Sequence, residues 1–369
     1  MILGVEAVNI RSGGGLKHLK TFIELNSKKN YFRKIVVYTN SKTKLELSSI
    51  DNVKLITKRA FDLPYFLYIF YQLIFLKSLL NKDKCDIVFV PGSILFTDYL
   101  SVLMPQNMLP FEKEESKRFS FMNRLKFYLV GIAQKYSLKK ADGVIYLSKY
   151  AKNKINVFSP FSKKTIIPHG INQSQEPAQI NTDFNKSNPM QLLYVSPVYP
   201  YKHHKLLVEA IEELINDGYF IDFKIVGGGP KYKVKELKDS ISNKSIKYIG
   251  DVNSEDVSTY YKNADVFIFA STCENLPITL LEAMSYGLPI ICSNYGVMPE
   301  VHNYSSEFFF DPTNKDSIKN SISKAYYNIN VLNKEAIKNK FLSSQYNWDL
   351  CVDSTNEFLK LCYQTSTNK

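Results

Sequence analysis

The chain has 369 residues, enough for two domains, and its 45% hydrophobic and 22% charged residues are typical of a soluble globular protein and exclude a disordered one. The net charge of +12 is unevenly distributed, because residues 1–170 carry 28 basic against 12 acidic side chains, whereas the remainder carries 19 against 23. The first half therefore predicts an acidic partner.

Cysteine use and the N-terminal residues indicate the compartment. The five cysteines form no C-x-x-C pair and leave one odd, which favours buried free thiols in a reducing cytosol. The opening "MILGVEAVNI" contains Glu6 and lacks both a basic leader and a cleavage site, so we expect no signal peptide.

Short apolar strands alternate with helical stretches along the chain. Strands are predicted at "ILGVEAV", "KIVVYT", "VKLIT", "DIVFV" and "GVIYL", and again after residue 190 at "QLLYVS", "FKIVGG", "IKYIG", "DVFIFA" and "PIICS". Helices are predicted at 15–28, 120–140, 203–217, 231–242, 253–263 and 276–286. This order is typical of an α/β fold with two doubly wound, Rossmann-like parallel-sheet domains.

The domain boundaries follow from composition. We expect a first domain at 1–169, a polar linker at 170–190, a second domain at 191–345, and a C-terminal amphipathic helix at 346–369 that packs back on the first domain. Ligands of such sheets bind beyond the carboxyl ends of the strands, so the sequence predicts a site in a central cleft between the domains.

The segment "LPYFLYIFYQLIFLKSLL", residues 63–80, approaches the length of a membrane span. Gln72, Lys77 and three tyrosines interrupt it. Three interpretations stay open: a crossover helix packed on a sheet, an interfacial helix that dips into lipid, and a true span.

A strand–turn–helix after residue 265 carries two carboxylates. The turn "TCEN" leads into the helix "LPITLLEAMSY", with Pro277 in its first turn. Such a helix directs backbone N–H groups at the ligand edge, so those near Asn275, Leu276 and Ile278 are candidate phosphate donors. Glu282 lies about 9 Å further along the axis and reaches back toward the same edge.

A carboxylate with two acceptor oxygens suits the two neighbouring hydroxyls of a ribose, which is the role we predict for Glu282. Glu274, in the turn, stands nearer the phosphates and is a candidate for the hydroxyls of a transferred sugar. The alternative is that Glu274 only caps the helix and that Glu282 points into water.

Nearly the whole chain resembles the retaining glycosyltransferases of family 4, which have the GT-B fold. The motifs that carry the resemblance are "CENLPITLLEAMSYGLPIICSNYGVMPEV", "GGGLKHL", "KIVGGGPKY", "GDVNSEDVSTYYKNADVFIFAS", "YLSKYAKN" and "IPHGIN". The resemblance implies that Glu282 binds the nucleotide ribose and Glu274 the donor sugar, while Lys202 and the backbone after Glu274 bind the diphosphate. It also implies front-face attack with no protein nucleophile. Because no Asp-x-Asp motif occurs, we expect no metal and no cofactor beyond the nucleotide-sugar co-substrate.

Glycine-rich turns follow the first strand of the first predicted domain and the second strand of the second one. Gly13, Gly14 and Gly15 are candidates for binding the donor phosphate or the acceptor, with a tight structural turn as the alternative. His18, one turn later, is a candidate ligand contact or a helix-packing residue. Gly228 belongs to a turn that the resemblance places near the nucleotide base, although a simple βα turn explains it equally well.

Two departures from the family affect the predicted chemistry. Ser196 and Pro197 stand where many members have Gly-Arg, so Lys202, His203 or His204 would have to contact the diphosphate. Gln106 and Asn107 occupy the region where many members have a histidine, and an amide hydrogen-bonds a sugar but cannot titrate. His169 is interpreted as a linker residue, and His302 has no predicted partner.

The basic clusters of the first half stand beside aromatic residues in "KKNYFRK", "KEESKRF", "NRLKFYLV" and "KKTIIPHG". Solvated faces are the default explanation. Nucleic acid is disfavoured because no recognised binding module accompanies them, whereas an anionic membrane surface suits this mixture. We therefore expect a cytoplasmic enzyme, peripherally associated with the inner face of the cell membrane.

The predicted activity is hexosyl transfer from a nucleotide-sugar donor to a lipid-linked or surface-polysaccharide acceptor, such as an O-antigen, capsule or lipopolysaccharide glycan. The alternatives are a catalytically silent sugar-nucleotide-binding partner and a nucleotide-sugar epimerase of the same fold.

Overall fold

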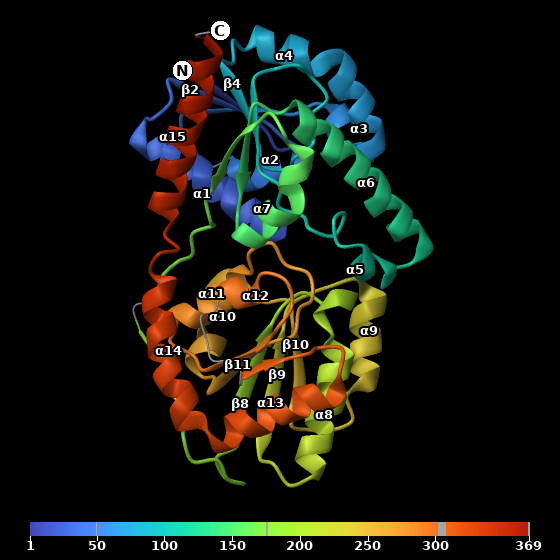
Figure 1. Cartoon of the computed structure of the whole chain (residues 1–369), viewed down its shortest axis with the longest axis vertical. Helices are drawn as coiled ribbons and strands as arrows, with labels where there is room; N and C mark the ends of the chain where they lie inside the picture. The colour runs from blue at the N-terminus through green and yellow to red at the C-terminus, as the bar shows by residue number, and fades with distance from the viewer. Residues whose placement is uncertain (49, 175, 302–307, 368–369) are drawn as a thin grey trace. The chain divides into compact units, whose positions relative to one another are not determined.

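The structure is a computed structural model that describes residues 1–48, 50–174, 176–301 and 308–367 (Figure 1). The chain divides into two compact units. Unit 1 comprises Met1–Ser116, Ser120–Gly170 and Tyr346–Lys369, and unit 2 comprises Lys117–Phe119 and Ile171–Gln345. Each is built on one parallel sheet with helices around it, which confirms the predicted α/β class.

The sheet of unit 1 has seven strands in the order β3-β2-β1-β4-β5-β6-β7. The strands are β1 (Ile2–Glu6), β2 (Lys34–Tyr38), β3 (Val53–Ile56), β4 (Ile87–Val90), β5 (Ser101–Leu103), β6 (Gly143–Tyr146) and β7 (Lys163–Ile166). The central strands are buried because they are near-continuous apolar runs. The order reverses between β1 and β4, which makes the edge beyond these two strands the natural ligand position of unit 1.

The helices of unit 1 connect these strands. They are α1 (Gly13–Lys29), α2 (Ser41–Leu47), α3 (Tyr65–Tyr71), α4 (Lys77–Lys82), α5 (Lys113–Lys117), α6 (Phe121–Lys140), α7 (Lys149–Ile155) and α15 (Trp348–Thr367), with short 3-10 turns at Arg59–Asp62 and Asn156–Phe158. A π-helical turn, Gln72–Leu76, joins α3 to α4. The apolar segment at 63–80 is therefore part of an interrupted helix of unit 1, with Tyr68, Leu76 and Leu80 buried.

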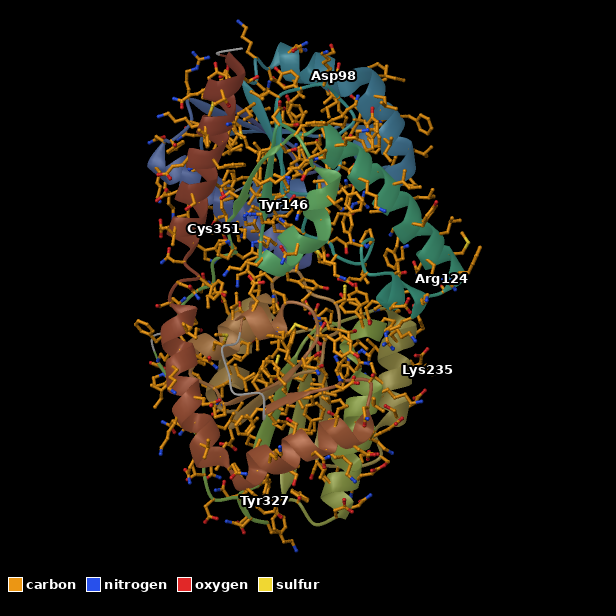
Figure 2. The ribbon with its side chains drawn as sticks, in the orientation of Figure 1. Asp98, Arg124, Tyr146, Lys235, Tyr327 and Cys351 are labelled. Atoms are coloured by element: carbon orange, nitrogen blue, oxygen red, sulfur yellow. The ribbon has the colours of Figure 1, made fainter. Side chains whose placement is uncertain are left out.

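Figure 2 labels side chains of both the interior and the surface. Tyr146 lies inside unit 1, where its hydroxyl is 2.7 Å from that of Ser159, whereas Lys235 lies on the outside of unit 2. All five cysteines are free and buried, as predicted. No helix among the described residues is both long and apolar enough to cross a membrane, so the interpretation of 63–80 as a span is wrong.

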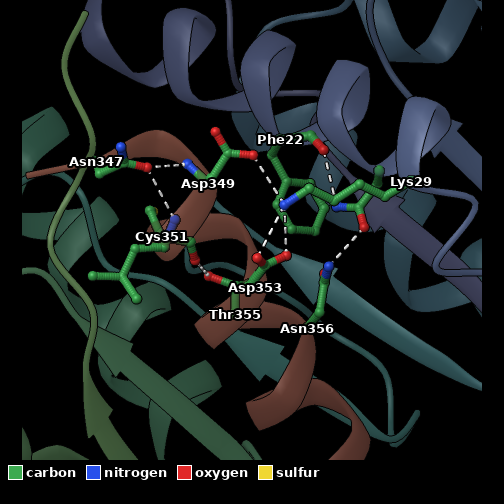
Figure 3. A network of polar contacts seen from close by, with 10 residues as sticks. Phe22, Lys29, Asn347, Asp349, Cys351, Asp353, Thr355 and Asn356 are labelled. Carbon is green, nitrogen blue, oxygen red and sulfur yellow. Dashed lines mark hydrogen bonds and ion pairs between the residues drawn. The ribbon is translucent and has the colours of Figure 1, made fainter. Parts of the chain in front are cut away.

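Polar contacts attach α15 to α1 within unit 1 (Figure 3). Lys29 donates to Asp353 at 2.8 Å and pairs with Asp349 at 3.0 Å, and buried Asn356 donates to the Asn26 side chain at 2.7 Å. Asn347 caps the start of the helix, where its side chain accepts from the backbone N–H of Asp349 at 2.7 Å. The last helix of the chain therefore belongs to the first unit.

The sheet of unit 2 has six parallel strands in the order β10-β9-β8-β11-β12-β13. The strands are β8 (Met190–Val195), β9 (Ile221–Val226), β10 (Ile246–Gly250), β11 (Val266–Phe269), β12 (Ile290–Ser293) and β13 (Phe309–Phe310). The helices are α8 (His204–Asn216), α9 (Lys231–Ser240), α10 (Ser254–Lys262), α11 (Ile278–Ser285), α12 (Met298–Val301), α13 (Lys315–Tyr327) and α14 (Ile329–Ser343), with a 3-10 turn at Pro200–Lys202.

The six helices predicted by residue range all form, and their ends lie within two residues of the prediction. The sequence missed the strands β5, β7 and β13. The first and last have only three and two residues, and β7 contains two lysines and is at most half-buried. Short or edge strands lack the apolar run that identifies a central strand.

Candidate functional site

The candidate site lies in unit 2, at the point where the strand order of the sheet reverses between β8 and β11. These two strands are hydrogen-bonded neighbours, with Val266 opposite Leu192 and Phe267 opposite Leu193. The loops that leave their carboxyl ends therefore start side by side, and ligands of open parallel sheets bind at such a position. Lys202 belongs to the loop after β8, and Glu274 belongs to the loop after β11.

The loop after β8 directs the Lys202 side chain inward. The turn at Pro200–Lys202 ends at His203, whose φ of 52° lies in the left-handed region that few residues other than glycine adopt. The Tyr194 hydroxyl donates to the Lys202 carbonyl at 3.1 Å and so fixes the turn. The helix α8 begins directly afterwards, which directs its first N–H groups toward the carboxyl edge of the sheet.

The loop after β11 presents Glu274 to this lysine. Lys202 and Glu274 form an ion pair, in which only 6% of the lysine side chain and 15% of the glutamate side chain are exposed. The Ser271 hydroxyl donates to the same carboxylate oxygen at 2.5 Å. The ammonium group also lies 4.9 Å from the centre of the Phe269 ring, so aromatic and carboxylate groups together hold it in a sparsely hydrated position.

Two further hydrogen bonds join the loops. The backbone N–H of Thr272 donates to the Tyr201 carbonyl at 2.9 Å, and the Thr272 hydroxyl lies 3.1 Å from Nε2 of His203. Because both loops start at neighbouring strands of one sheet, these contacts make the placement of Lys202 against Glu274 a property of the fold of unit 2.

The histidines beside Lys202 are uncharged at neutral pH. Burial lowers the pKa of His203 to about 4, and burial together with the nearby Lys202 charge lowers the pKa of His204 to about 3. His204 stacks on Tyr194 at 4.9 Å and contacts the Ser196 hydroxyl at 3.0 Å. Lys202 therefore supplies positive charge here, and the histidines supply hydrogen bonds only.

The second carboxylate, Glu282, stands in α11, which begins after the loop that carries Glu274. Its side chain is half-buried, and the buried Tyr261 hydroxyl of α10 shares its single proton between Oε2, at 3.3 Å, and the Thr279 carbonyl oxygen, at 3.2 Å. The alternative in which Glu282 only points into water is thereby excluded. The backbone of Asn275, Leu276 and Pro277 leads into the helix, and all three residues are buried.

The glycine turn after β9 lies against the loop after β8. Gly227 has a φ of 137°, and a Cβ atom there would lie 2.2 Å from the Ser196 carbonyl oxygen. A Cβ atom on Gly229 would lie 2.9 Å from the Val198 side chain, while Gly228 faces Asp251. These glycines are therefore required for close backbone packing beside the candidate site.

The predicted residues of unit 1 form a separate group beyond β1 and β5. Gly13, Gly14 and Gly15 form the first turn of α1, and a Cβ atom on Gly15 would lie 2.8 Å from Oε1 of Gln106. Asn107 is exposed, and its side chain accepts from the backbone N–H of Leu109 at 3.1 Å. The glycine turn and this amide loop are therefore adjacent in unit 1.

His18 and His169 are both buried in unit 1. Their ring centres are 4.9 Å apart, and both rings pack against Trp348, at 5.9 and 6.2 Å. Burial lowers the pKa of His18 to about 4 and that of His169 well below its ordinary value. The packing alternative for His18 is confirmed, and the interpretation of His169 as a linker residue is wrong. His302 lies outside the described residues.

Sequence reasoning missed the residues that hold the candidate site residues and their loops in place. Ser271, Thr272, Tyr194 and Tyr261 carry no motif of their own, and they act only because strands or helices bring them beside Lys202, Glu274 or Glu282. Ser271 was the one that spacing could have found, since it lies three residues before Glu274. Among the described residues, no three His, Cys, Asp or Glu side chains group as a metal site.

Comparison with known proteins identifies unit 2. Residues 176–343 match the family described as glycosyl transferases group 1. This match spans nearly all of the second unit. The chain is similar to the protein CapJ of Staphylococcus aureus, with 30% identity over 210 residues, and to the O-antigen chain mannosyltransferase B of Escherichia coli, with 30% identity over 116 residues. The CapJ match covers 54% of this chain and 51% of CapJ, so the chain spans about half the length of that relative.

Solved glycosyltransferases share the fold over the whole chain. Sucrose-phosphate synthase from Thermosynechococcus elongatus superposes with a TM-score of 0.76, 14% identity and coverage of 99% of this chain and 100% of the other. Anabaena HepE in complex with UDP and glucose gives a TM-score of 0.72, 16% identity and coverage of 98% and 99%. The fold of the chain is therefore GT-B, as the resemblance stated from the sequence implied.

Proposed function

We propose that the protein is a retaining glycosyltransferase that transfers a hexose from a nucleotide-sugar to a lipid-linked or surface-polysaccharide acceptor. The observation that carries this proposal is the ion pair of Lys202 and Glu274 at the carboxyl edge of β8 and β11. A cation, a carboxylate and two helix starts converge there. A sugar diphosphate offers anionic oxygens and sugar hydroxyls, which are the groups that such an edge recognises.

In the proposed reaction, the bond between the anomeric carbon and the diphosphate oxygen breaks, and the acceptor oxygen bonds to the same face of that carbon. The acceptor proton passes to the departing diphosphate. Lys202 and the backbone N–H groups at Asn275, Leu276 and Ile278 stabilise the negative charge that develops on the leaving group. The protein contributes position and charge, and we expect the reaction to need no metal.

Lys202 changes partner during this cycle. In the absence of the donor, Glu274 neutralises the positive charge of Lys202, so the buried ammonium group is paired. When the diphosphate enters, the ammonium group contacts phosphate, and the Glu274 carboxylate becomes an acceptor for hydroxyls of the sugar. Ser271 keeps that carboxylate in position through the exchange.

Glu282 binds the ribose. Its half-buried carboxylate accepts from Tyr261 through Oε2, and the two oxygens of a carboxylate suit the two neighbouring hydroxyls of a ribose. Ser196, His203 and Gly228 complete the donor-binding group. The acceptor contacts the glycine turn of unit 1, at Gly13–Gly15, and the neighbouring Asn107.

The acceptor class rests on the name of one relative, an O-antigen chain mannosyltransferase. A lipid-linked glycan would bring the enzyme to the inner face of the cell membrane, where it would work as a peripheral cytoplasmic protein. The excess of basic residues in 1–170 supports an anionic surface as a partner.

The test is a thermal-shift screen of the full chain against uridine, guanosine and adenosine diphosphates, because ligand binding raises the unfolding temperature. We expect one nucleotide to stabilise the protein, and its sugar conjugates then enter a transfer assay. Donor binding with no transfer to lipid-linked or polysaccharide acceptors would favour the silent partner. Conversion of the donor without acceptor would favour the epimerase. No stabilisation by any of the three would contradict a nucleotide site.

A further inference from the structure

Helix α6 of unit 1 exposes an apolar stripe to solvent. The exposed side chains are Phe121, Met122, Leu125, Tyr128, Leu129, Ile132 and Tyr136. At 100° per residue all seven fall within an arc of about 120°, which places them on one side of the helix. The first members are the most exposed, at 73% for Phe121, 70% for Met122 and 67% for Tyr128. An amphipathic helix of a monomeric protein normally turns such a stripe inward.

The opposite side of α6 faces the unit. Gly131, Ala133, Gln134, Ser137 and Leu138 are buried there. The Ser137 hydroxyl accepts from the backbone N–H of Leu95 at 3.0 Å, which fixes the rotation of the helix. The apolar stripe is thus held outward by the packing of α6.

Positive charge borders the stripe. Helix α6 contains no aspartate or glutamate, and its exposed basic residues are Arg124, Lys126, Lys135, Lys139 and Lys140. Figure 2 shows Arg124 at the outer end of α6, away from the strands of unit 1. At 100° per residue, Arg124 and Lys135 fall along one side of the stripe and Lys126 along the other.

A second exposed apolar group lies beside α6. Leu67, Phe70, Leu73, Ile74 and Phe75, of α3 and the π-helical turn, are exposed. The loop at 94–97 joins the two groups, because the Phe96 backbone N–H donates to Gln72 at 3.1 Å while the Phe96 ring stacks on Tyr136 at 5.3 Å. Figure 1 shows α3 and α6 on the same side of unit 1. The segment from Tyr65 to Lys82 also lacks acidic residues.

We infer that this face, formed by the exposed apolar residues of α6, α3 and the π-helical turn and called the α6 face below, docks on an anionic phospholipid bilayer. The apolar and aromatic side chains enter the boundary between headgroups and acyl chains, and the flanking arginine and lysines contact lipid phosphates. Among the described helices, none is long and apolar enough to span a membrane.

Charge decides between a bilayer and a second copy of the chain. Two copies joined through α6 would bring ten basic side chains together without an acidic residue of that helix to compensate them. Asp98 is an acidic residue that follows the loop at 94–97. Its carboxylate already pairs with Lys77, at 3.4 Å. An anionic lipid surface removes this repulsion and attracts the same charges.

The inference extends the proposed membrane association by naming the surface, and it does not depend on glycosyl transfer. The test is co-sedimentation of the full chain with vesicles of phosphatidylcholine alone or of equal parts phosphatidylcholine and phosphatidylglycerol. We expect partition onto the anionic vesicles, decreasing as salt rises, and much weaker partition onto the neutral ones.

Two variants separate the apolar from the charged contribution. Replacing Phe121, Met122 and Tyr128 together by Gln, a good helix former, should lower partition roughly tenfold or more on anionic vesicles. Replacing Arg124 and Lys126 by Gln should lower it about fivefold per charge on anionic vesicles only. The matched control is Ile337→Gln with Phe341→Gln on α14 of unit 2, where the side chains are 69% and 80% exposed, and we expect it to partition as the wild type does.

A local probe supports the assignment independently. The five native thiols are buried, so a cysteine placed by Leu129→Cys can be labelled selectively with an environment-sensitive fluorophore. Its emission should shift to the blue with anionic vesicles, whereas a label at Phe341→Cys should not respond.

Three results would overturn the inference. The first is equal sedimentation of the wild type with and without anionic vesicles. The second is unchanged partition of the α6 apolar variant. The third is a lipid-free dimer that the same variant converts to monomer, which would assign the α6 face to a second copy. Nucleoside diphosphate binding, measured on every variant by thermal shift, should stay as in the wild type. A protein that partitions onto vesicles but binds no nucleotide would contradict the proposed activity and leave the α6 face standing.

Discussion

Removal of the Lys202 charge tests the candidate site most directly. Lys202→Met keeps most of the aliphatic stem and deletes the ammonium group, which leaves the Glu274 carboxylate without its cation. Breaking a fully buried pair costs about 3–5 kcal/mol. Since 15% of Glu274 is exposed and Ser271 still donates to it, we expect a loss of about 1–3 kcal/mol in the unfolding free energy of unit 2.

The catalytic effect should be larger. The ammonium group is placed to stabilise charge on the departing diphosphate, and losing such a preorganised donor lowers kcat/KM by about 10²- to 10³-fold. The matched control is Lys205→Met, on the surface of α8. The Lys205 side chain is 73% exposed and reaches Glu209 only at 3.9 Å, so the control should change stability by less than about 0.5 kcal/mol and leave activity unchanged.

A double variant separates stability from catalysis. Lys202→Met combined with Glu274→Gln removes both charges, so urea denaturation should show recovery of most of the lost stability. The same protein should regain no transfer activity, because cation and carboxylate are both gone. If Lys202→Met retained activity equal to that of Lys205→Met, the assignment of Lys202 to the leaving group would be wrong. If the double variant recovered no stability, the ion pair would not exist in solution.

Three further outcomes follow from other contacts. Glu282→Gln should weaken binding of the preferred nucleoside diphosphate by about 1–3 kcal/mol and that of its 2′-deoxy analogue by less, because the analogue keeps only the 3′-hydroxyl, and calorimetry that found equal losses would refute a contact to the 2′-hydroxyl. Gly227→Ala should cost more than about 3 kcal/mol, because its Cβ atom would meet the Ser196 carbonyl, whereas Gly218→Ala, with nothing within 4 Å, should cost only about 1 kcal/mol in the same denaturation assay. Because the pKa of His18 falls from 6.5 to about 4, its neutral form stabilises the fold fully above pH 6.5, and this contribution declines as pH drops toward 4. Stability measured against pH should thus decline less steeply over this window for His18→Phe than for the wild type, and identical slopes would show that His18 is not buried neutral.

Glu6 acts in the opposite direction over an overlapping range. Burial raises the pKa of its carboxyl to about 7, so its protonated form stabilises the fold at low pH and this contribution is lost as pH rises from 4.5 through 7. The Tyr68 hydroxyl donates to Oε1 at 2.9 Å, which partly offsets the burial. The His18 comparison must therefore be made between variants that both retain Glu6.

The helices and strands with a clear hydrophobic or turn pattern in their own residues could be predicted from the sequence alone. Central strands such as β4 and β11 are uninterrupted apolar runs, and the turn "TCENLP" marks the start of α11, so the order of the main elements and the α/β class followed from local pattern, while the GT-B class followed from the family resemblance. The candidates Glu274 and Glu282 were also found from sequence, since they lie in and after that turn, and Lys202 was found through the family resemblance.

Only the tertiary structure decided which side chains meet. Lys202 and Glu274 are 72 residues apart, and no pattern states that they form an ion pair, because the contact depends on β8 and β11 being neighbours in the sheet. His169 stands in a polar-looking passage, yet it is buried because α15 returns to unit 1 and places Trp348 against it. The stripe on α6 has the period of a core helix, and only the packing of its Gly131–Ser137 side against unit 1 shows that the apolar side faces outward. Sequence fixes the period of a helix, but its rotation about its own axis is set by contacts from distant residues.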